Sequence, residues 1–170
     1  MTPHEIANLL TQKFTDAIDA SLPDDKHPRI HTTAEHWRPI AEFLRRDSAM
    51  AFDLLNCLTG VDYIDDGKLC AVYDFYSYTH DHHFAVKVYT DRGRPQIPSV
   101  ADLWATANWH EREAYDLFGI IFEGHPALHR ILLPEDWLGH PLRKDYVFPR
   151  EYHGIPGSTE LDWQQKPTYP

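Results

Sequence analysis

The stretch DGKLCAVYDFYSYTHDHHFAVKVY, residues 66–89, decides the fold. Its first two residues, Asp-Gly, are typical of a hairpin turn, and the run LCAVYDFYSY that follows has the composition of a β-strand. After THDH, apolar Phe84, Val86 and Val88 alternate with residues that can face solvent, as in a half-buried strand. Together with an apolar run over residues 52–64, the stretch predicts three consecutive strands with short connections, which favour antiparallel pairing.

Two helices are expected before these strands. The first covers residues 3–19, where Thr2 is the N-cap and Glu5 completes a capping box. A short strand candidate at Arg29–His31 follows, and a second capping box formed by Thr32 and Glu35 is expected to start the next helix. Helices followed by a meander of strands indicate an α+β fold, with helices packed on a mostly antiparallel sheet.

A third helix is expected over residues 100–118, capped by Ser99 and ended by Gly119. At 100° per residue, an apolar face is opposed by an arc that holds Trp109, Arg112, Glu113 and Asp116. One interpretation is a solvated face with an Arg112–Asp116 ion pair. The other is a buried contact, because tryptophan and arginine together are typical of protein interfaces.

Composition changes after this helix, since seven of the 13 prolines lie in the last 45 residues. We therefore expect a body over residues 1–122 and an extended, proline-rich docking arm over residues 123–170. Gly-His-Pro occurs at 124–126 and again at 139–141, and each triplet predicts a turn followed by an extended run. The two histidines are expected to form hydrogen bonds at these turns. The apolar anchors of the arm are expected to be Ile131, Leu132, Leu133 and Trp137.

No catalytic, metal-binding or cofactor-binding residue is expected in this chain. His110-Glu111 does not extend to H-E-x-x-H because residue 114 is alanine, and His110 falls on the apolar face as a hydrogen-bonded core histidine. Cys57 and Cys70 are too few to hold an iron–sulfur cluster. Two weaker metal hypotheses stay open: the tip His80-Asp81-His82-His83, and the pair His125 and His140 with Glu135 or Asp136.

Charge and hydropathy exclude several classes of protein. The formal net charge of −10 argues against a nucleic-acid-binding protein, which would present a basic face. The sequence has no apolar run near the roughly 20 residues that span a bilayer. The first residues lack the basic and apolar regions of a secretion signal, so we expect a cytoplasm-like compartment.

The run from Trp109 to Tyr146 resembles the C subunit, or thirty-kilodalton subunit, of proton-pumping NADH:quinone oxidoreductase, respiratory complex I. The resemblance is carried by Glu111-Arg112-Glu113, Tyr115-Asp116, Phe118-Gly119-Ile120, Phe122-Glu123-Gly124-His125-Pro126, Arg130-Ile131-Leu132-Leu133-Pro134, Asp136-Trp137 and Gly139-His140-Pro141-Leu142-Arg143-Lys144-Asp145-Tyr146. His129 departs from the basic residue usual in the family, and Val147 stands where proline is common.

The resemblance implies a scaffold piece of the peripheral arm of complex I, on the cytoplasmic face of a bacterial inner membrane. Its implied partners are the quinone-site D subunit and neighbouring iron–sulfur subunits, and the chain meets the membrane only through the complex. FMN and Fe–S clusters belong to the assembled complex, and none is expected in this chain. The residues expected at the partner interface are Trp109, Glu111, Arg112, Glu113, Asp116, His125, Pro126, Arg130, Trp137, His140, Pro141, Arg143, Lys144 and Asp145.

Three alternatives remain at this point. The first is the equivalent scaffold subunit of a membrane-bound hydrogenase or of a ferredoxin- or deazaflavin-linked complex. The second is a free-standing metalloenzyme built on the 12 histidines. The third is an acidic adaptor protein outside respiration.

Overall fold

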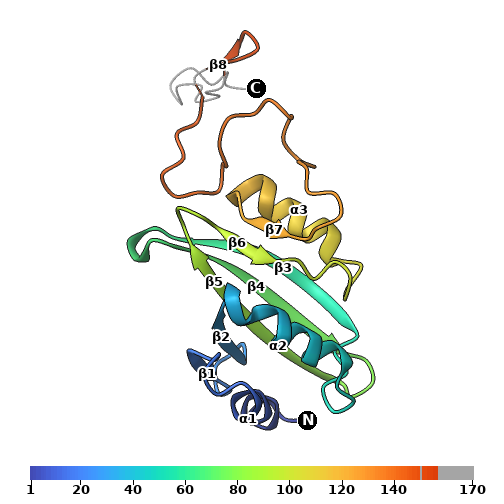
Figure 1. The fold of residues 1–170 in the computed structure, drawn as a ribbon. Helices are drawn as coiled ribbons and strands as arrows, with labels where there is room; N and C mark the ends of the chain where they lie inside the picture. Colours follow the sequence, from blue (N-terminus) through green and yellow to red (C-terminus); the bar gives the residue numbers. More distant parts are fainter. Residues whose placement is uncertain (150, 157–170) are drawn as a thin grey trace, which may run out of the picture.

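A five-stranded mixed sheet forms the centre of the chain (Figure 1), seen in a computed structural model that describes residues 1–149 and 151–156. The strand order is β1-β2-β5-β4-β3. The β3–β4 and β4–β5 pairs are antiparallel, whereas β2 runs parallel to β5. The strands are β1 (Ala20–Leu22), β2 (Arg29–Thr33), β3 (Leu54–Tyr63), β4 (Lys68–Ser77) and β5 (His82–Asp91). The α+β class and the mostly antiparallel sheet are confirmed.

The hairpin between β3 and β4 forms where Asp66-Gly67 predicts it. Tyr63 pairs with Lys68, so the loop has four residues, and three of them form a short 3-10 helix, Ile64–Asp66. Gly67 ends that helix with a φ of 62°, in the left-handed region that glycine adopts without steric cost. The loop is therefore longer than the two-residue turn for which Asp-Gly is best known.

The helix α1 (Pro3–Lys13) begins with the expected capping box between Thr2 and Glu5. It ends six residues before the predicted residue 19, because the chain turns toward β1 and the N–H of Asp19 donates to the carbonyl of His31. The second capping box is wrong. The N-cap of α2 (Ala34–Arg46) is Thr33, with no side-chain cap bond, while Thr32 is buried in β2 and its hydroxyl donates to the carbonyl of Ala17.

The third helix is shorter than predicted. The helix α3 spans Ala107–Phe118, and residues 101–103 and 105–106 before it form turns. Two side chains in and beside these turns bind backbone carbonyls in and just before β3: the indole N–H of Trp104 donates to Phe52, and the hydroxyl of Thr106 donates to Leu55. These contacts stabilise the turns, so the residues before Ala107 do not form a further turn of helix.

Two short strands flank α3 and were not predicted. They are β6 (Gln96–Pro98) and β7 (Ile121–Glu123), which pair in parallel. Gly119 ends α3 with a φ of 75°, as expected, and directs the chain from the helix into β7. Because three-residue strands carry no clear period, sequence pattern alone does not reveal this pair.

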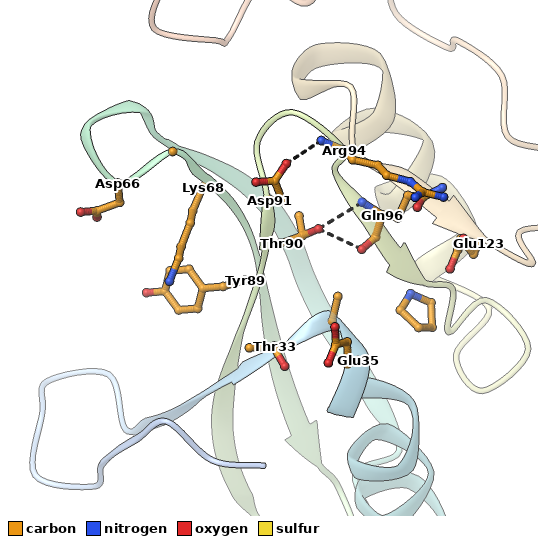
Figure 2. A pocket seen from close by; sticks show the side chains of 13 residues that line it. Thr33, Glu35, Asp66, Lys68, Tyr89, Thr90, Asp91, Arg94, Gln96 and Glu123 are labelled. Carbon is orange, nitrogen blue, oxygen red and sulfur yellow. Dashed lines mark hydrogen bonds between the residues drawn. The ribbon is translucent and has the colours of Figure 1, made fainter. Parts of the chain in front are cut away.

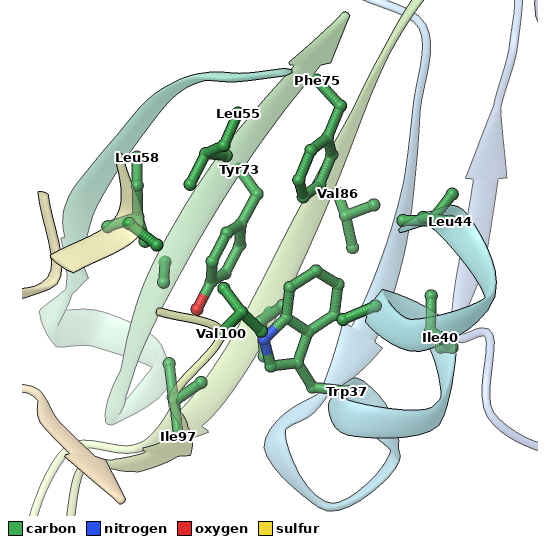
Figure 3. Close-up of a cluster of buried hydrophobic side chains, with 14 of the residues drawn as sticks. Trp37, Ile40, Leu44, Leu55, Leu58, Tyr73, Phe75, Val86, Ile97 and Val100 are labelled. Atoms are coloured by element: carbon green, nitrogen blue, oxygen red, sulfur yellow. The ribbon is translucent and has the colours of Figure 1, made fainter. Parts of the chain in front are cut away.

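The helices α1, α2 and α3 contribute buried side chains to one cluster with a single face of the sheet. Figure 3 shows Trp37 of α2 lying against Tyr73 of β4, with ring centroids 4.3 Å apart. Tyr73 and Phe75 extend along β4 beneath the helices. The opposite face of the sheet points away from this cluster. No helix among the described residues is long and apolar enough to cross a membrane.

The helix α3 covers the outer edge of β3. The ring of His110 accepts the N–H of Leu58 at Nδ1 (3.0 Å), so this half-buried histidine is hydrogen-bonded as predicted. Further along α3, Phe118 lies directly over Gly60, where an added Cβ would come within 2.4 Å of the ring. Covering an edge strand in this way blocks its pairing with other chains.

The approach of Phe118 to Gly60 gives a stability prediction. Gly60→Ala should lower the free energy of unfolding by about 1–3 kcal/mol, because the new methyl group overpacks a closed contact. Urea denaturation followed by circular dichroism measures the change. The combination with Phe118→Leu should recover part of the loss. If Gly60→Ala is neutral in both backgrounds, α3 does not press on β3 as described.

Candidate functional site

The carboxylate of Asp116 is the centre of the contact between α3 and the arm. Its side chain is fully buried, and Oδ2 accepts three consecutive backbone N–H groups, from Ile131 (3.0 Å), Leu132 (2.8 Å) and Leu133 (3.0 Å). Oδ1 accepts a fourth bond from the guanidinium of Arg130 at 2.7 Å. All four of these donors belong to the arm.

Burial acts to raise the pKa of Asp116, but these four donors more than offset it and hold the pKa below its ordinary value. The carboxylate is therefore ionised at neutral pH. The alternative pairing with Arg112 is wrong: Asp116 binds Arg130 instead, because the arm brings a guanidinium and three N–H groups to the buried side of the helix.

Arg130 also closes the first loop of the arm. One amino group donates to the backbone carbonyl of Asp116, and the other donates to the carbonyls of Trp137 (3.0 Å) and Gly139 (3.1 Å). His140 then donates from Nδ1 to the carbonyl of Asp116 at 2.9 Å. A single guanidinium thus links α3 to the far end of the loop.

A second set of contacts binds the arm beyond this loop. The N–H of Leu142 donates to the carbonyl of Leu117 (3.1 Å), and Arg143 donates from Nε to the carbonyl of Phe118 (2.7 Å). Both carbonyls lie at the C-terminal end of α3, where carbonyl groups lack helical partners and cations are favoured. Arg143 therefore caps α3 within the same chain.

The third contact joins the arm to the sheet. Arg92, directly after β5, binds the carboxylate of Asp62 with two bonds (2.8 and 3.1 Å) and also binds the carboxylate of Asp145. The N–H of Lys144 donates to Asp62 as well, at 2.8 Å. The side chain of Lys144 is exposed. Of Arg143, Lys144 and Asp145, which were expected to meet a partner, the first and the last thus bind the body of their own chain through their side chains.

Glu111 lies on α3 and is buried where the helix meets the first residues of the arm. Its carboxylate accepts bonds from the Ser99 hydroxyl (2.6 Å) and the Val100 N–H (2.8 Å), and lies 4.0 Å from Nε2 of His125. Burial raises the pKa of Glu111 to about 7, although the two hydrogen bonds lower it in part. These bonds use the Ser99 hydroxyl that was expected to cap a helix.

His125 is neutral in this arrangement. Its Nδ1 accepts the N–H of Ala127 and its Nε2 donates to the carbonyl of Asn108, a pattern that one neutral tautomer satisfies. Burial also lowers the pKa of His125 below its ordinary value. The two Gly-His-Pro histidines therefore form hydrogen bonds to backbone groups, as predicted. Pro126 is exposed and Pro141 is half-buried beside them.

The exposed side of α3 carries Trp109, whose side chain is 61% exposed. The guanidinium of Arg112 lies over its ring, 4.7 Å from the centroid, and also contacts the ring and carbonyl of His129. His129 thus has a partner inside the chain. Glu113, the next residue after Arg112 on the helix, is exposed.

Trp137 organises the far end of the arm. Its indole N–H donates to the hydroxyl of Tyr146 (2.9 Å), and its ring lies 5.0 Å from that of Tyr152. Residues 151–156 form a small hairpin of β8 (Glu151–Tyr152) and β9 (Ile155–Pro156), where no strand was predicted. Within residues 124–149 no helix or strand forms. Residues 150 and 157–170 of the predicted arm lie outside the described residues.

Neither metal hypothesis gains a cluster of ligands. Among residues 1–149 and 151–156, no group of three His, Cys, Asp or Glu side chains is placed to hold an ion. In the tip after β4, His82 is buried with Nε2 bonded to the carbonyl of Met50, and His80 binds the carbonyl of Ser48.

Asp62, Arg92 and Ser99 complete the site but lie far from the arm in sequence, where no motif marks them.

Residues 30–152 match the family described as "Respiratory-chain NADH dehydrogenase, 30 Kd subunit". The chain belongs to this family. Among its relatives, the NADH-quinone oxidoreductase C subunit of Chloroherpeton thalassium is 50% identical over 157 residues, covering 90% of this chain and 65% of the relative. The protein of the same name from Chlorobium phaeobacteroides is 47% identical over 87% of this chain and 90% of its own length. The chain therefore spans just under two thirds of the first relative.

Two solved structures share the fold of this chain. A trypsin-resistant fragment (1–134) of Nqo5 is 29% identical, with a TM-score of 0.61, covering 74% of this chain and 99% of the fragment. A chain of the membrane-bound sulfane sulfur reductase, an archaeal respiratory membrane complex, is 24% identical, with a TM-score of 0.68 over 86% of each chain. At that identity the second likeness concerns the fold alone.

Removing the carboxylate of Asp116 should release the arm without unfolding the body. In Asp116→Ala, hydrogen exchange at the amides of residues 131–133 should accelerate by about tenfold or more, because three N–H groups lose their acceptor. Amides of β4 and β5 should stay protected. The matched control is Glu113→Ala, an exposed acid on the same helix, which should leave exchange unchanged. Unchanged protection at 131–133 in Asp116→Ala would contradict this account.

The buried acid Glu111 predicts a pH dependence of stability. Its folded pKa of about 7 exceeds the ordinary value of 4.5, so the stability that protonation confers is complete below pH 4.5 and lost as the pH rises through 7. Glu111→Gln keeps the shape and cannot ionise. Its free energy of unfolding should exceed that of the natural chain by about 3 kcal/mol at pH 8.5 and match it near pH 4. Equal pH profiles from urea denaturation would refute the prediction.

Proposed function

We propose that this chain is a non-catalytic structural subunit of the peripheral arm of proton-translocating NADH:quinone oxidoreductase, respiratory complex I. In this proposal the body, residues 1–122, is a folded base, and the arm from residue 123 presents a surface to other subunits. Membership of the 30-kilodalton subunit family and the naming of the relatives support the assignment.

The observation that carries the proposal is the distribution of polar groups on the inner side of the arm and apolar groups on its outer side. The polar groups on its inner side are bonded to α3 and the sheet through Asp116, Phe118 and Asp62. Its outer side leaves large apolar side chains in solvent, with exposed fractions of 59% for Leu132, 87% for Leu138, 85% for Val147 and 56% for Phe148. A segment that forms no helix or strand over residues 124–149 and has an apolar outer side suits burial against another protein.

The proposal extends to the partners and cofactors of the assembly. The quinone-site D subunit and the neighbouring iron–sulfur subunits are the proposed partners, while FMN and the Fe–S clusters reside in other chains. Trp109, Glu113 and Lys144, which face outward, are the signature residues best placed to contact them. The buried signature residues, such as Glu111 and Asp116, would act by shaping the arm. The complex would place this chain at the cytoplasmic face of the bacterial inner membrane, as a peripheral subunit.

The test is the composition of the complex that contains this chain. A tagged chain purified from gently solubilised membranes should bring flavin-, cluster- and quinone-site subunits, together with inhibitor-sensitive NADH:quinone activity. Hydrogenase or ferredoxin-linked subunits in place of the NADH-binding ones would assign it to a related complex. Recovery of the chain alone would overturn the proposal.

The outer side of the arm should matter for assembly and not for folding. Leu138→Asp combined with Val147→Asp should reduce recovery of the other subunits by about tenfold, because two carboxylates would be buried at an apolar contact. The melting temperature of the isolated chain should change little, since both side chains are in solvent. A matched control is Tyr78→Asp, whose side chain is 71% exposed at the opposite end of the sheet. Equal recovery in both variants would exclude the arm as the docking surface.

A further inference from the structure

The sheet has a second face, opposite the three helices, with an unusual grouping of side chains. Side chains alternate across each strand, so when Leu69, Ala71 and Tyr73 of β4 enter the core, Lys68 and Val72 point the other way. The same alternation places on this face the group that we call the basic aromatic cluster. It consists of His31, Tyr63, Lys68, Lys87 and Tyr89, from strands β2, β3, β4 and β5.

The members of the basic aromatic cluster hold one another in place. The ring centroids of Tyr63 and Tyr89 lie 5.6 Å apart, and His31 lies 5.5 Å from Tyr89 on the other side. Lys87 donates from Nζ to the hydroxyl of Tyr63 at 3.0 Å, and the Nζ of Lys68 lies 5.8 Å from the centroid of Tyr89. Two ammonium groups are thus positioned over a shelf of aromatic rings, and their side chains have already lost part of their conformational freedom.

The two lysines place positive charge on the surface of an acidic chain. The formal net charge is −10, yet within the described residues neither Lys68 nor Lys87 has a carboxylate oxygen within 4.0 Å. Arg29, beside them on β2, is already bound to Asp25 at 3.0 Å. Burial lowers the pKa of His31, and the charges of Lys87 and Arg29 lower it further, while Asp19 acts in the opposite direction.

The edge of this positive region is marked by a cavity of about 780 Å³ (Figure 2). Lys68 and Tyr89 form one wall, where Figure 2 shows the lysine side chain alongside the tyrosine ring. The other lining residues include Arg94 and four carboxylates, from Glu35, Asp66, Asp91 and Glu123. The carboxylates disfavour an anion inside the cavity, so an anionic segment would reach Lys68 from the open face of the sheet, where Lys87 lies.

We propose that the basic aromatic cluster docks an acidic segment of a partner polypeptide, with Asp or Glu carboxylates bound to Lys68 and Lys87 over the rings of Tyr63 and Tyr89. This inference rests on the proposal that the chain is a subunit of an assembly. It does not depend on the arm, which meets the opposite side of the fold through Asp116 and Asp62.

Charge counting favours a polypeptide over other polyanions. Nucleic acid carries a charge at every phosphate and would be repelled by the net charge of the chain, which two lysines do not reverse. An anionic membrane attracts a protein by about 1 kcal/mol for each basic residue near its surface. Proteins that bind such membranes typically present a cluster of four to eight basic residues. A short acidic peptide presents a few carboxylates, each of which can form a charge-assisted hydrogen bond with an ammonium group.

Zero-length carbodiimide cross-linking of the native complex tests this directly, because it joins an amine to a carboxylate only where the two are in contact. Lys68 or Lys87 should be found joined to Asp or Glu of another subunit, in a segment rich in acids. Lys26, an exposed lysine away from the cluster, is the control for random reaction. Cross-links at the cluster no more frequent than at Lys26 would overturn the inference and leave the proposed function standing.

Charge reversal supplies the second measurement. Lys68→Glu with Lys87→Glu should reduce recovery of the partner by about tenfold, since a like-charge contact costs several kcal/mol, whereas Lys26→Glu should not. Circular dichroism establishes folding. If the reversed chain does not fold, Lys68→Gln with Lys87→Gln removes the charges without adding new ones, and recovery of the partner must still fall.

Three results would count against the inference. Full recovery of all subunits with the charge-reversed chain would exclude the cluster as a docking surface. Binding of the natural chain, but not the reversed one, to a labelled single-stranded oligonucleotide or to phosphatidylglycerol vesicles would assign the cluster to another class of partner. Recovery of the tagged chain with no other subunit would overturn both this inference and the proposed function.

Discussion

The structure of the arm depends on one buried carboxylate. Asp116 accepts three consecutive N–H groups and a guanidinium, and all four donors come from residues 130–133. An unpaired carboxylate in this position would be costly, and a segment with no helix or strand has few other acceptors for its N–H groups. The carboxylate thus gains hydrogen-bond donors, and the N–H groups of the arm gain an acceptor. Arg130 also donates to two backbone carbonyls at the end of the loop and so fixes its conformation.

The body and the arm are stabilised by different forces. The body buries a continuous apolar cluster between one sheet face and three helices. The arm is attached mainly through hydrogen bonds and ion pairs, with α3, with the end of the sheet at Asp62 and with Arg92. Several of its large apolar side chains consequently stay outside, and this inversion of the usual arrangement underlies its proposed role in assembly.

A sheet with helices on one face offers two surfaces of different character. The helix side carries the arm, with apolar groups outermost, whereas the open side carries two lysines on a shelf of tyrosines. The first suits a contact stabilised by apolar burial. The second suits a contact in which charge selects the partner and its orientation. A subunit that joins several chains can use both without interference between them.

Local chemistry was sufficient to predict much of the body. Some signals act over only a few residues, so the neighbouring sequence is enough to predict their effect. They are the alternation of the strands, Asp66-Gly67, Gly119 and the capping box at Thr2. The second capping box failed because Thr32 is drawn into β2, where its hydroxyl meets a carbonyl 15 residues away. The predicted start of α3 failed for a similar reason, since Ser99 binds Glu111 instead of capping a helix.

The sequence by itself determined the class of fold, the positions of most strands, the change of character near residue 123 and the family to which the motifs belong. Only the tertiary structure decided which donors Asp116 accepts, that Glu111 is buried beside His125, and that Arg92 joins Asp62 to Asp145. Periodicity assigns a side chain to a face of its element but does not say what lies opposite that face. The partner is chosen by the path of the whole chain, which brings together residues that no local pattern connects.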